Sequence, residues 1–475
     1  MEQPRSASVL AQYPQPDTAR LSAALAAEAN ANQRKIIVLD DDPTGVQTVH
    51  DIFVYTDWSI ESLRKGFAAP EKLFFILTNS RGFTVAETTK AHIEIAEHVD
   101  QVAREFGMDY LIISRGDSTL RGHYPLETDL LRQVAEKKGG FAMDGEILCP
   151  YFKEGGRFTL DNVHYVRYGD ELVPCGQTEF AKDETFGYTS SNLCDYIEEK
   201  TAGKFRAGDV TCISLESLRA LNFDGIEAQL LAVHDFGKVV VNAVEDCDVQ
   251  AFAVALYRAM AKGRHFTIRC AAALVKAIGN ISSQPLLSRK QMVTLKSSAG
   301  GIIVVGSHTK KTTAQLEELK NVPGIEFIEM DSDKVLIPGA LEQEAASIIE
   351  RCAQLIQQGT TCCVSTKRTV LTLPDDTPEA ALVRSVAISD ALQSCVGKLP
   401  VTPAFVVAKG GITSSDVGVK ALRVQCARVL GQIRPGIPVW QTGPESLFPG
   451  TPYVIFPGNV GEVSTLREAV EILLG

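Results

Sequence analysis

Cysteines with the spacing of a metal site or a redox motif are absent from this sequence. It has eleven cysteines, an odd number, and no CxxC pair or Cys/His cluster, so neither a zinc site nor a disulfide framework is indicated. Cys362 and Cys363 are neighbours in an apolar run that is typical of a buried strand. Free thiols in such numbers favour a reducing, cytoplasmic compartment.

Features of membrane, secreted and nucleic-acid-binding proteins are also scarce. The longest uncharged stretch, residues 446–461, contains three prolines and cannot form a membrane-spanning helix. Residues 1–35 lack the apolar segment of a secretion signal. The 47 Lys and Arg against 58 Asp and Glu give a net charge of −11, which argues against a dedicated nucleic-acid-binding protein. We therefore expect a cytoplasmic protein with no membrane or nucleic-acid partner.

Several catalytic signatures are missing as well. The sequence has no GxxxxGKS/T loop, no GxGxxG after an apolar run, no GxSxG elbow and no HExxH pair. Neither a P-loop nucleotidase nor an ordinary Rossmann dehydrogenase is therefore indicated. The last two absences exclude the common serine-hydrolase and zinc-protease signatures.

The chain does contain an ordinary globular composition over 475 residues, enough for two or three domains. Short apolar runs, such as residues 36–39, 73–77 and 111–113, are followed by polar turns and then by segments of helical period. Buried parallel strands alternating with helices produce this pattern. The sequence predicts two α/β domains with mainly parallel sheets and a ligand cleft between them.

The breaks in this pattern predict the domain boundaries. Residues 1–31 are expected to form an N-terminal extension with a short helix capped by Asp17. Residues 32–285 form the first predicted domain and residues 286–475 the second. Inside the first domain, residues 150–192 break the rhythm and predict an irregular or antiparallel insertion.

The first domain carries charge at the predicted strand ends, where α/β proteins bind ligands. Residues 40–42 are three aspartates directly after an apolar run. Such acids can deprotonate a hydroxyl or bind magnesium, although aspartate-rich turns also cap helices. Arg81, Arg115 and Arg121 occupy similar turns, and guanidinium groups bind carboxylates and phosphates. Together they predict a pocket for a small anion.

The second domain carries glycine-containing turns and little acid. These turns include Gly306 and Ser307, Gly410 and Gly411, and the segment from Gly458. Backbone N–H groups at the start of a helix bind phosphate, although glycine is also the ordinary residue of turns. Three such turns in one domain predict a nucleotide site.

A few other polar residues are weaker candidates. His123 and His164 are expected in polar loops beside the arginine-containing turns, where a structural role is the commoner one. Asp416 is expected at the start of a helix that reaches Leu430, where it would complement the helix dipole.

Six longer motifs run through both domains: LDDDPTGVQTVHD (39–51), TNSRG (78–82), SRGDSTLRGHYPLETDLL (114–131), GRFTLDNVHYV (156–166), AKGGITSSDVGVKAL (408–422) and FPGNVG (456–461). In content and order they resemble the four-carbon acid sugar kinase family, which includes D-threonate, D-erythronate and 3-oxo-tetronate kinases. The resemblance covers about residues 32–470. It implies an acid-sugar domain, an ATP domain, a homodimer, and phosphorylation of the C4 hydroxyl of a four-carbon sugar acid. ATP and Mg²⁺ are the cofactors that this reaction requires.

The resemblance also assigns roles to individual positions, although it assigns no metal ligands. The family's acidic turn corresponds to Asp41 and Asp42, of which one would accept the hydroxyl proton. The implied sugar-acid contacts are Arg81, Asp117, Ser118, Thr119 and Arg121. The implied ATP contacts are Ser307, Gly410, Gly411 and Gly458.

Three positions depart from the family pattern. Many members have an aromatic residue at the position of Pro43, and many have Glu and Gly at the positions of Ile412 and Ser415. The identity of the sugar acid is therefore open. Two other functions are also open: a sugar-acid lyase or isomerase whose glycine turns bind a substrate phosphate, and a non-catalytic sensor of sugar acid and nucleotide.

Overall fold

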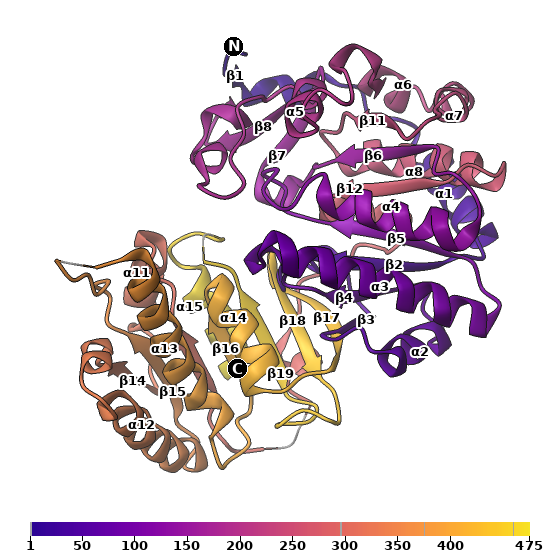
Figure 1. Cartoon of the computed structure of the whole chain (residues 1–475). Helices are drawn as coiled ribbons and strands as arrows, with labels where there is room; N and C mark the ends of the chain where they lie inside the picture. Colours follow the sequence, from indigo (N-terminus) through magenta and orange to yellow (C-terminus); the bar gives the residue numbers. More distant parts are fainter. Residues whose placement is uncertain (1, 295–296, 375, 459) are drawn as a thin grey trace. The chain divides into compact units, whose positions relative to one another are not determined.

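The computed structural model describes residues 2–294, 297–374, 376–458 and 460–475. The described chain divides into two compact units (Figure 1). Unit 1 contains the chain up to Gly45 and Asp57–Ser283, and unit 2 contains Val46–Thr56 and Gln284–Gly475.

The division differs from the predicted domains in residues 284–285, which belong to unit 2, and in one longer segment. Residues 46–56, which the sequence analysis assigned to the first domain, belong to unit 2. The reason is strand pairing, because β3 (Ile52–Tyr55) pairs antiparallel with β17 (Cys426–Arg434). Such a long-range pairing leaves no local signal in the sequence.

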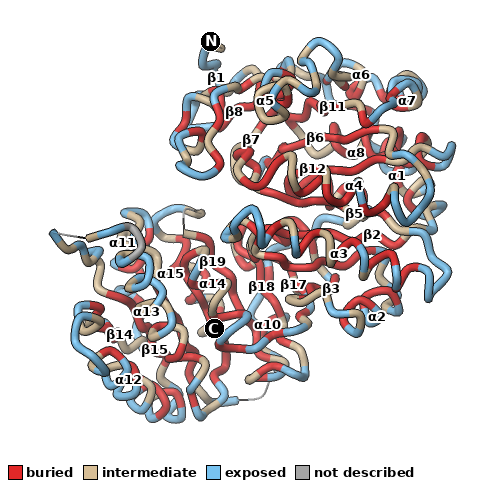
Figure 2. The backbone as a smooth tube through the Cα atoms, in the orientation of Figure 1, coloured by how far each residue is buried: buried red, intermediate tan, exposed pale blue. Residues whose placement is uncertain are grey.

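Unit 1 is built on a parallel sheet with the strand order β10-β11-β6-β12-β5-β2-β4. Every residue of β2 is buried, including its central Ile-Ile-Val-Leu run, because helices cover both faces of the sheet (Figure 2). The strands are β2 (Lys35–Asp40), β4 (Leu73–Leu77), β5 (Tyr110–Arg115), β6 (Gly145–Cys149), β10 (Thr211–Ile213), β11 (Gly237–Val241) and β12 (Phe266–Cys270).

The helices of unit 1 have local start and stop signals. For example, α3 begins with a capping box in which Thr84 and Glu87 hydrogen-bond each other's backbone N–H groups. It ends at Gly107, whose φ of 61° suits glycine. The helices are α1 (Thr18–Ala31), α2 (Ile60–Ala68), α3 (Val85–Phe106), α4 (Leu126–Gly139), α5 (Leu193–Lys200), α6 (Leu215–Arg219), α7 (Phe223–Leu231), α8 (Asp246–Ala261) and α9 (Ala272–Ile278).

The N-terminal segment is part of unit 1. Asp17 caps α1 by accepting from the backbone N–H of Arg20 at 3.0 Å, as predicted. The helix packs against α8, and Nε of Arg258 donates to Oε1 of Glu28 at 2.8 Å. The N-terminal segment therefore contributes to the packing of unit 1.

The irregular or antiparallel insertion predicted at residues 150–192 contains antiparallel strands. A small separate sheet has the order β1-β9-β8-β7, with antiparallel pairing throughout. Its strands are β1 (Arg5–Ser6), β7 (Arg157–Leu160), β8 (Val163–Tyr168) and β9 (Glu171–Pro174).

Unit 2 contains a mixed sheet with the order β3-β17-β18-β19-β16-β13-β15-β14, antiparallel up to β19 and parallel from there. Its remaining strands are β13 (Ile302–Val305), β14 (Ile325–Met330), β15 (Thr361–Thr366), β16 (Val406–Lys409), β18 (Ile437–Thr442) and β19 (Pro452–Phe456). Its helices are α10 (Arg289–Met292), α11 (Lys310–Leu319), α12 (Ala340–Gln357), α13 (Pro378–Gly397), α14 (Gly411–Asp416) and α15 (Thr465–Leu474).

One predicted helix of unit 2 is too long. The expected helix to Leu430 ends after a π-helical turn at Val417–Ala421, and Leu430 lies in β17. The burial along β17 alternates from residue to residue, which is the period of a half-exposed strand. Cys362 and Cys363 are buried in β15, as predicted.

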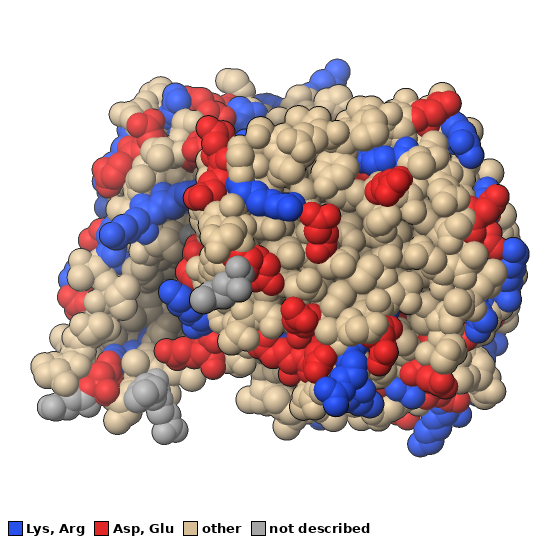
Figure 3. Space-filling view, turned by 90° about the horizontal axis from the view of Figure 1, so that it is seen from above, with Lys and Arg blue, Asp and Glu red and all other residues tan. Residues whose placement is uncertain are grey.

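No helix among the described residues is long and apolar enough to cross a membrane. On the face drawn in Figure 3, Lys and Arg side chains are interspersed with Asp and Glu.

Candidate functional site

Three neighbouring strands of unit 1 end in charged residues or lead into a turn that contains one. β2 ends at Asp40 and continues into Asp41 and Asp42, Arg115 is the last residue of β5, and Arg81 lies in a short 3-10 turn after β4. β2 pairs with both β4 and β5, and all three run parallel. Their carboxyl ends therefore meet at one edge of the sheet, where α/β proteins bind ligands.

Arg81 binds both predicted catalytic acids. Its Nε and Nη2 donate to Oδ2 and Oδ1 of Asp41 at 3.2 and 2.8 Å, and its Nη1 donates to Oδ2 of Asp42 at 3.2 Å. Oδ1 of Asp42 accepts from the backbone N–H and the hydroxyl of Thr44 at 2.8 and 2.5 Å. The Asp42 side chain is 18% exposed and that of Asp41 only 3%, so Asp42 is the acid that a ligand can reach.

Asp40 is buried as fully as Asp41, with 2% of its side chain exposed against 3%. Nη1 of Arg115 donates to Oδ1 of Asp40 at 3.0 Å and to Oδ1 of Asp41 at 3.3 Å. A Cβ at Gly45 would lie 2.1 Å from the Asp40 carboxylate oxygens, so only glycine fits there. Burial raises the pKa of Asp40 to about 7 against the opposing charge of Arg115.

The pKa of Asp42 is shifted in the opposite direction to that of Asp40. Burial acts to raise its pKa, but the charge of Arg81 and the hydrogen bonds from Thr44 outweigh it and lower the pKa. Asp42 is therefore an ionised acceptor at neutral pH, held in one orientation by Arg81.

The second predicted substrate turn forms a group of its own. Nε of Arg121 donates to Oδ2 of Asp117 at 2.8 Å, and the Thr119 hydroxyl also donates to Asp117. Burial opposes ionisation of Asp117, but the charges of Arg81 and Arg121 hold its pKa well below the usual range. The Arg121 guanidinium lies 5.1 Å from the ring centroid of Phe180. The predicted contact Ser118 contributes its backbone oxygen, which lies 2.8 Å from Nε2 of His164.

A further buried arginine supports these turns, and the sequence analysis missed it. Nη1 of Arg269, in β12, donates to Oε2 of Glu127 at 2.7 Å and to Oγ of Ser114 at 3.2 Å. Its Nη2 donates to the backbone oxygen of Arg121 at 3.2 Å. A Cβ at Gly116 would lie 2.1 Å from Cζ of Arg269. The signal in the sequence that could have identified Arg269 is its position near the end of a short, mostly apolar strand.

The two candidate histidines, His123 and His164, have structural roles. His164 lies in the strand β8, contrary to the loop expectation, between the Thr159 hydroxyl at 2.9 Å and the Ser118 carbonyl at 2.8 Å. Burial lowers its pKa to about 4, which leaves it neutral. Nε2 of His123 lies 2.9 Å from the carbonyl oxygen of Phe83.

In unit 2, three of the predicted ATP contacts lie together. β13, β16 and β19 are neighbours, and Ser307, Gly410 and Gly458 follow their carboxyl ends. A Cβ at Gly410 would lie 3.2 Å from Cβ of Ser307, and one at Gly458 would lie 3.3 Å from Oγ of Ser307. Gly410 has φ 130° and ψ 149°, a conformation almost confined to glycine. Gly411 comes next and has open space around its Cβ position.

Hydroxyl groups line the same turns. Oγ1 of Thr312 lies 3.0 Å from Oγ of Ser307 and 3.1 Å from the carbonyl oxygen of Gly458. Oγ1 of Thr309 accepts from the backbone N–H of Thr312 at 3.2 Å and caps α11. Hydroxyl and backbone donors at a helix start suit phosphate oxygens.

Lys409 is the second functional candidate that the sequence analysis missed. It ends β16, directly before Gly410, and is fully buried. Its Nζ donates to the carbonyl oxygens of Pro457 and Gly458 at 2.5 and 3.1 Å, and no acidic side chain pairs with it among the described residues. Burial lowers its pKa to about 7, and Lys311 adds to the effect. A bound phosphate would supply the missing negative charge.

Two other predicted positions need comment. Asp416 ends α14 rather than starting a helix, and it accepts from the Ser389 hydroxyl at 2.8 Å and pairs with Lys420 at 3.1 Å. Its role is therefore structural. Asn459, which follows Gly458 in the FPGNVG motif, lies outside the described residues.

The donor set of unit 2 is compatible with magnesium. The described residues contain no group of three or more His, Cys, Asp or Glu side chains that could hold a metal ion. Magnesium at phosphoryl-transfer sites needs few protein ligands, because substrate phosphates supply the others. The hydroxyls of Ser307, Thr309 and Thr312 are hard oxygen donors beside the phosphate-type turns, and they fit Mg²⁺ bound together with a nucleotide.

Comparison with known families assigns a domain type to each unit. A model described as a sugar-binding N-terminal domain matches residues 36–278. A model described as a nucleotide-binding C-terminal domain matches residues 302–466. The aspartate and arginine cluster lies in the first match, and the glycine turns lie in the second.

Individual relatives agree with these matches. The D-threonate kinase of Salmonella typhimurium is 23% identical over 372 residues, which cover 76% of this chain and 80% of that protein. A Haemophilus influenzae structure of family DUF1537 has a TM-score of 0.61 at 17% identity, covering 92% of this chain and 100% of that one. A Salmonella typhimurium structure provisionally described as a tRNA synthase has a TM-score of 0.65 at 15% identity, covering 91% and 98%. At these identities the two structures show the fold alone.

The fold is thus that of a two-domain α/β protein with a sugar-binding and a nucleotide-binding domain. The chain belongs to the four-carbon acid sugar kinase family, as its motifs predicted.

Proposed function

We propose that the protein is an ATP-dependent kinase that phosphorylates the C4 hydroxyl of a four-carbon sugar acid of the threonate, erythronate or 3-oxo-tetronate type. One observation carries the proposal. The sugar-binding domain contains a cluster of carboxylates and arginines, and the nucleotide-binding domain contains turns rich in backbone and hydroxyl donors. The relative named D-threonate kinase supports the same class of reaction.

We assign the general base to Asp42, one of the two acids that the sequence analysis proposed. It is ionised, it is the more exposed of the two, and Arg81 fixes its orientation. Asp41 would act by positioning Arg81, to which it is bound by two hydrogen bonds. Phosphoryl transfer depends mainly on such positioning and on neutralising charge.

The other residues of the sugar-binding domain would bind the acid. Arg81 and Arg121 are partly exposed cations, suited to the substrate carboxylate or to the phosphoryl group in transfer. Asp117, Ser118 and Thr119 offer groups that can hydrogen-bond the sugar hydroxyls.

ATP would bind through the turns of unit 2. Backbone N–H groups at Ser307, Gly410, Gly411 and Gly458 would contact the phosphates, and Lys409 would add a positive charge beside them. When bound, Mg²⁺ neutralises phosphate charge. The proposal further includes a homodimer and a cytoplasmic location, as the sequence analysis expects.

The test is ADP release by the full chain with ATP and Mg²⁺ against D- and L-threonate, D- and L-erythronate and 3-oxo-tetronate. We expect one acid to support turnover of about 1–100 per second and the no-sugar control to be silent. ADP release that does not depend on a sugar acid would contradict the proposal. Bound nucleotide with no turnover on any of these acids would favour the sensor function instead.

A further inference from the structure

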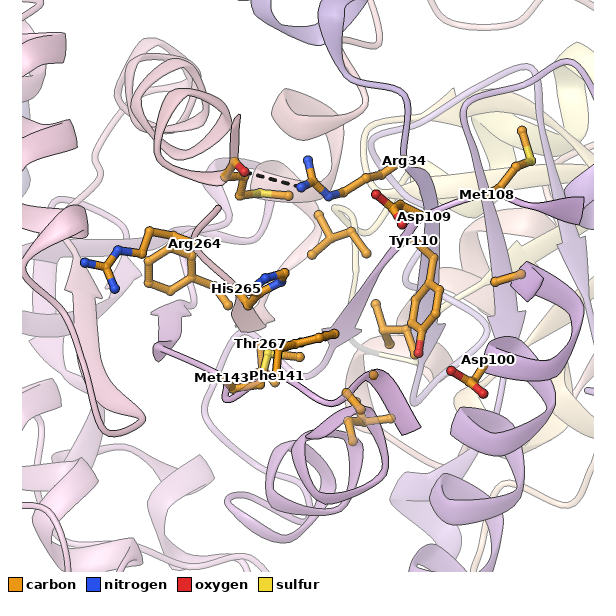
Figure 4. Close-up of a pocket in the computed structure, with 18 of the residues that line it drawn as sticks. Arg34, Asp100, Met108, Asp109, Tyr110, Phe141, Met143, Arg264, His265 and Thr267 are labelled. Carbon is orange, nitrogen blue, oxygen red and sulfur yellow. Dashed lines mark hydrogen bonds between the residues drawn. The ribbon is translucent and has the colours of Figure 1, made fainter. Parts of the chain in front are cut away.

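A second ligand site is indicated in unit 1, away from the aspartate and arginine cluster. A cavity of about 500 Å³ lies at the start of β5 and β12, where Tyr110 and Phe266 line it (Figure 4). The catalytic candidates follow the opposite, carboxyl ends of the parallel strands. The cavity therefore belongs to the other edge of the same sheet.

The cavity wall is largely apolar and adaptable. It includes Met108, Met143 and Met260, three of the six methionines of the chain, whose flexible side chains adjust to the shape of a ligand. Phe141 adds a flat surface, because its ring stacks on that of His265 with a centroid distance of 4.0 Å and an interplanar angle of 20°. Such a wall suits a planar apolar body.

One polar group in the wall lacks a partner. Thr267 is 4% exposed, lines the cavity, and its Oγ1 has no hydrogen-bond partner among the described residues. A buried hydroxyl without a partner is costly. A ligand atom that hydrogen-bonds Oγ1 would remove that cost.

Of three arginines in the cavity wall, two form ion pairs and one forms none among the described residues. Arg104 pairs with Asp100 at 2.9 Å, and Arg264 pairs with Asp144 at 2.6 Å. Arg34, by contrast, donates from Nη2 to the carbonyl oxygen of Met260 at 3.3 Å and has no ion pair among the described residues. Arg34 is therefore the cation that remains for a ligand.

We propose that this cavity binds a small amphipathic monocarboxylate with a planar apolar body. Its carboxylate would pair with Arg34, its apolar body would lie against the methionines and Phe141, and one of its acceptor atoms would take the hydrogen bond of Thr267. The wall also contains Asp109, whose negative charge would oppose a ligand of higher negative charge such as a nucleotide. The site does not depend on the proposed kinase activity.

The first experiment measures binding of 2-naphthoate and its uncharged analogue 2-naphthamide to the full chain by ligand-observed NMR and by thermal shift. We expect 2-naphthoate to bind and to raise the melting temperature, with 2-naphthamide binding about tenfold more weakly because it lacks the charge. Binding should persist with ATP and a four-carbon sugar acid present in excess. Failure of both probes, equal binding of the two, or displacement by ATP would overturn the proposal.

Three substitutions locate the probe in the cavity. Arg34→Gln should weaken 2-naphthoate binding about tenfold without changing 2-naphthamide binding, and Thr267→Val should weaken both probes by a smaller factor. Ala135→Leu adds a larger side chain to the cavity wall and should abolish binding. The matched control Arg206→Gln removes an exposed arginine that pairs with Glu198 at 3.3 Å and should change nothing. If binding survives both Arg34→Gln and Ala135→Leu, the probe binds elsewhere and the inference is wrong.

Discussion

Arg81 holds Asp41 with two parallel hydrogen bonds, from Nε to Oδ2 at 3.2 Å and from Nη2 to Oδ1 at 2.8 Å. This fork fixes the plane of the guanidinium and leaves Nη1 to bind Asp42. A planar group with donors at fixed angles is required for this arrangement, and lysine cannot provide one. The orientation of the proposed base therefore depends on a pair of residues from two neighbouring strands.

Arg81→Lys keeps the charge but loses the fork. Hydrogen bonds to charged groups contribute about 1.5–3 kcal/mol, so we expect kcat/KM for the sugar acid to fall roughly 10- to 100-fold while ATP binding is unchanged. The control is Arg64→Lys, because Arg64 binds Glu105 through the same two-bond fork on the surface, at 2.7 and 3.0 Å. Steady-state kinetics compare both variants with wild type. Equal activity of Arg81→Lys and wild type would refute the role of the fork.

Asp42→Asn and Asp41→Asn distinguish the proposed general base, Asp42, from the residue proposed to position Arg81, Asp41. Removal of a general base lowers kcat by about 10²–10⁴-fold, and we expect this loss for Asp42→Asn with little change in nucleotide affinity. Asp41→Asn should lower stability as well as activity, because it leaves Arg81 and Arg115 with less buried negative charge. Near wild-type turnover of both variants would show that neither residue is the base.

Gly410→Ala should weaken ATP binding, whereas Gly411→Ala should not. Alanine at Gly410 would adopt a strained conformation at φ 130° and approach Ser307 within 3.2 Å, at a cost of about 1–3 kcal/mol. At Gly411 the added methyl group meets nothing within 4 Å. Calorimetric titration with ATP compares the pair. Equal affinities would mean that the turn at Gly410 does not hold the phosphates.

Lys409→Met should change the pH dependence of stability. Burial lowers the pKa of Lys409 from 10.5 to about 7 in the folded chain, so the unfolded chain binds more protons between these values. Wild-type stability should therefore rise with pH relative to Lys409→Met, by up to about 1.4 kcal/mol per pH unit. Urea unfolding at about pH 7 and about pH 9 measures the difference.

The matched control for that experiment is Lys420→Met. Lys420 pairs with Asp390 and Asp416, both at 3.1 Å, and burial is outweighed by these acids, so its pKa is raised. Its protonation does not change in this pH window, and the difference from wild type should stay flat. A flat difference for Lys409→Met as well would show that Lys409 is not titrating there.

Local sequence predicted the parts of the site that lie at strand ends. The apolar run before Asp40 and the polar turn around Arg81 mark strand ends without knowledge of the fold, and parallel pairing then brings them together. Arg269 was missed because its contact with Ser114 spans 155 positions and depends on β12 lying beside β5. Local sequence patterns do not predict that β12 pairs with β5.

Burial was the second kind of information that the sequence lacked. Lys409 belongs to the quoted AKGGITSSDVGVKAL motif, but a lysine before two glycines is expected to be exposed. Only the structure shows that its Nζ is buried and donates to the carbonyl oxygen of Pro457. The helix predicted to Leu430 failed for a related reason, since β17 alternates between buried and exposed residues only in the context of its neighbours β3 and β18.

The most direct test of the central claim is identification of the product by NMR. The full chain is incubated with ATP, Mg²⁺ and the sugar acid that supports ADP release, and ¹H–³¹P correlation spectra locate the new phosphate. We predict a phosphomonoester whose phosphorus couples to the methylene protons of C4. Phosphate on another oxygen of the acid, or free inorganic phosphate alone, would contradict the account.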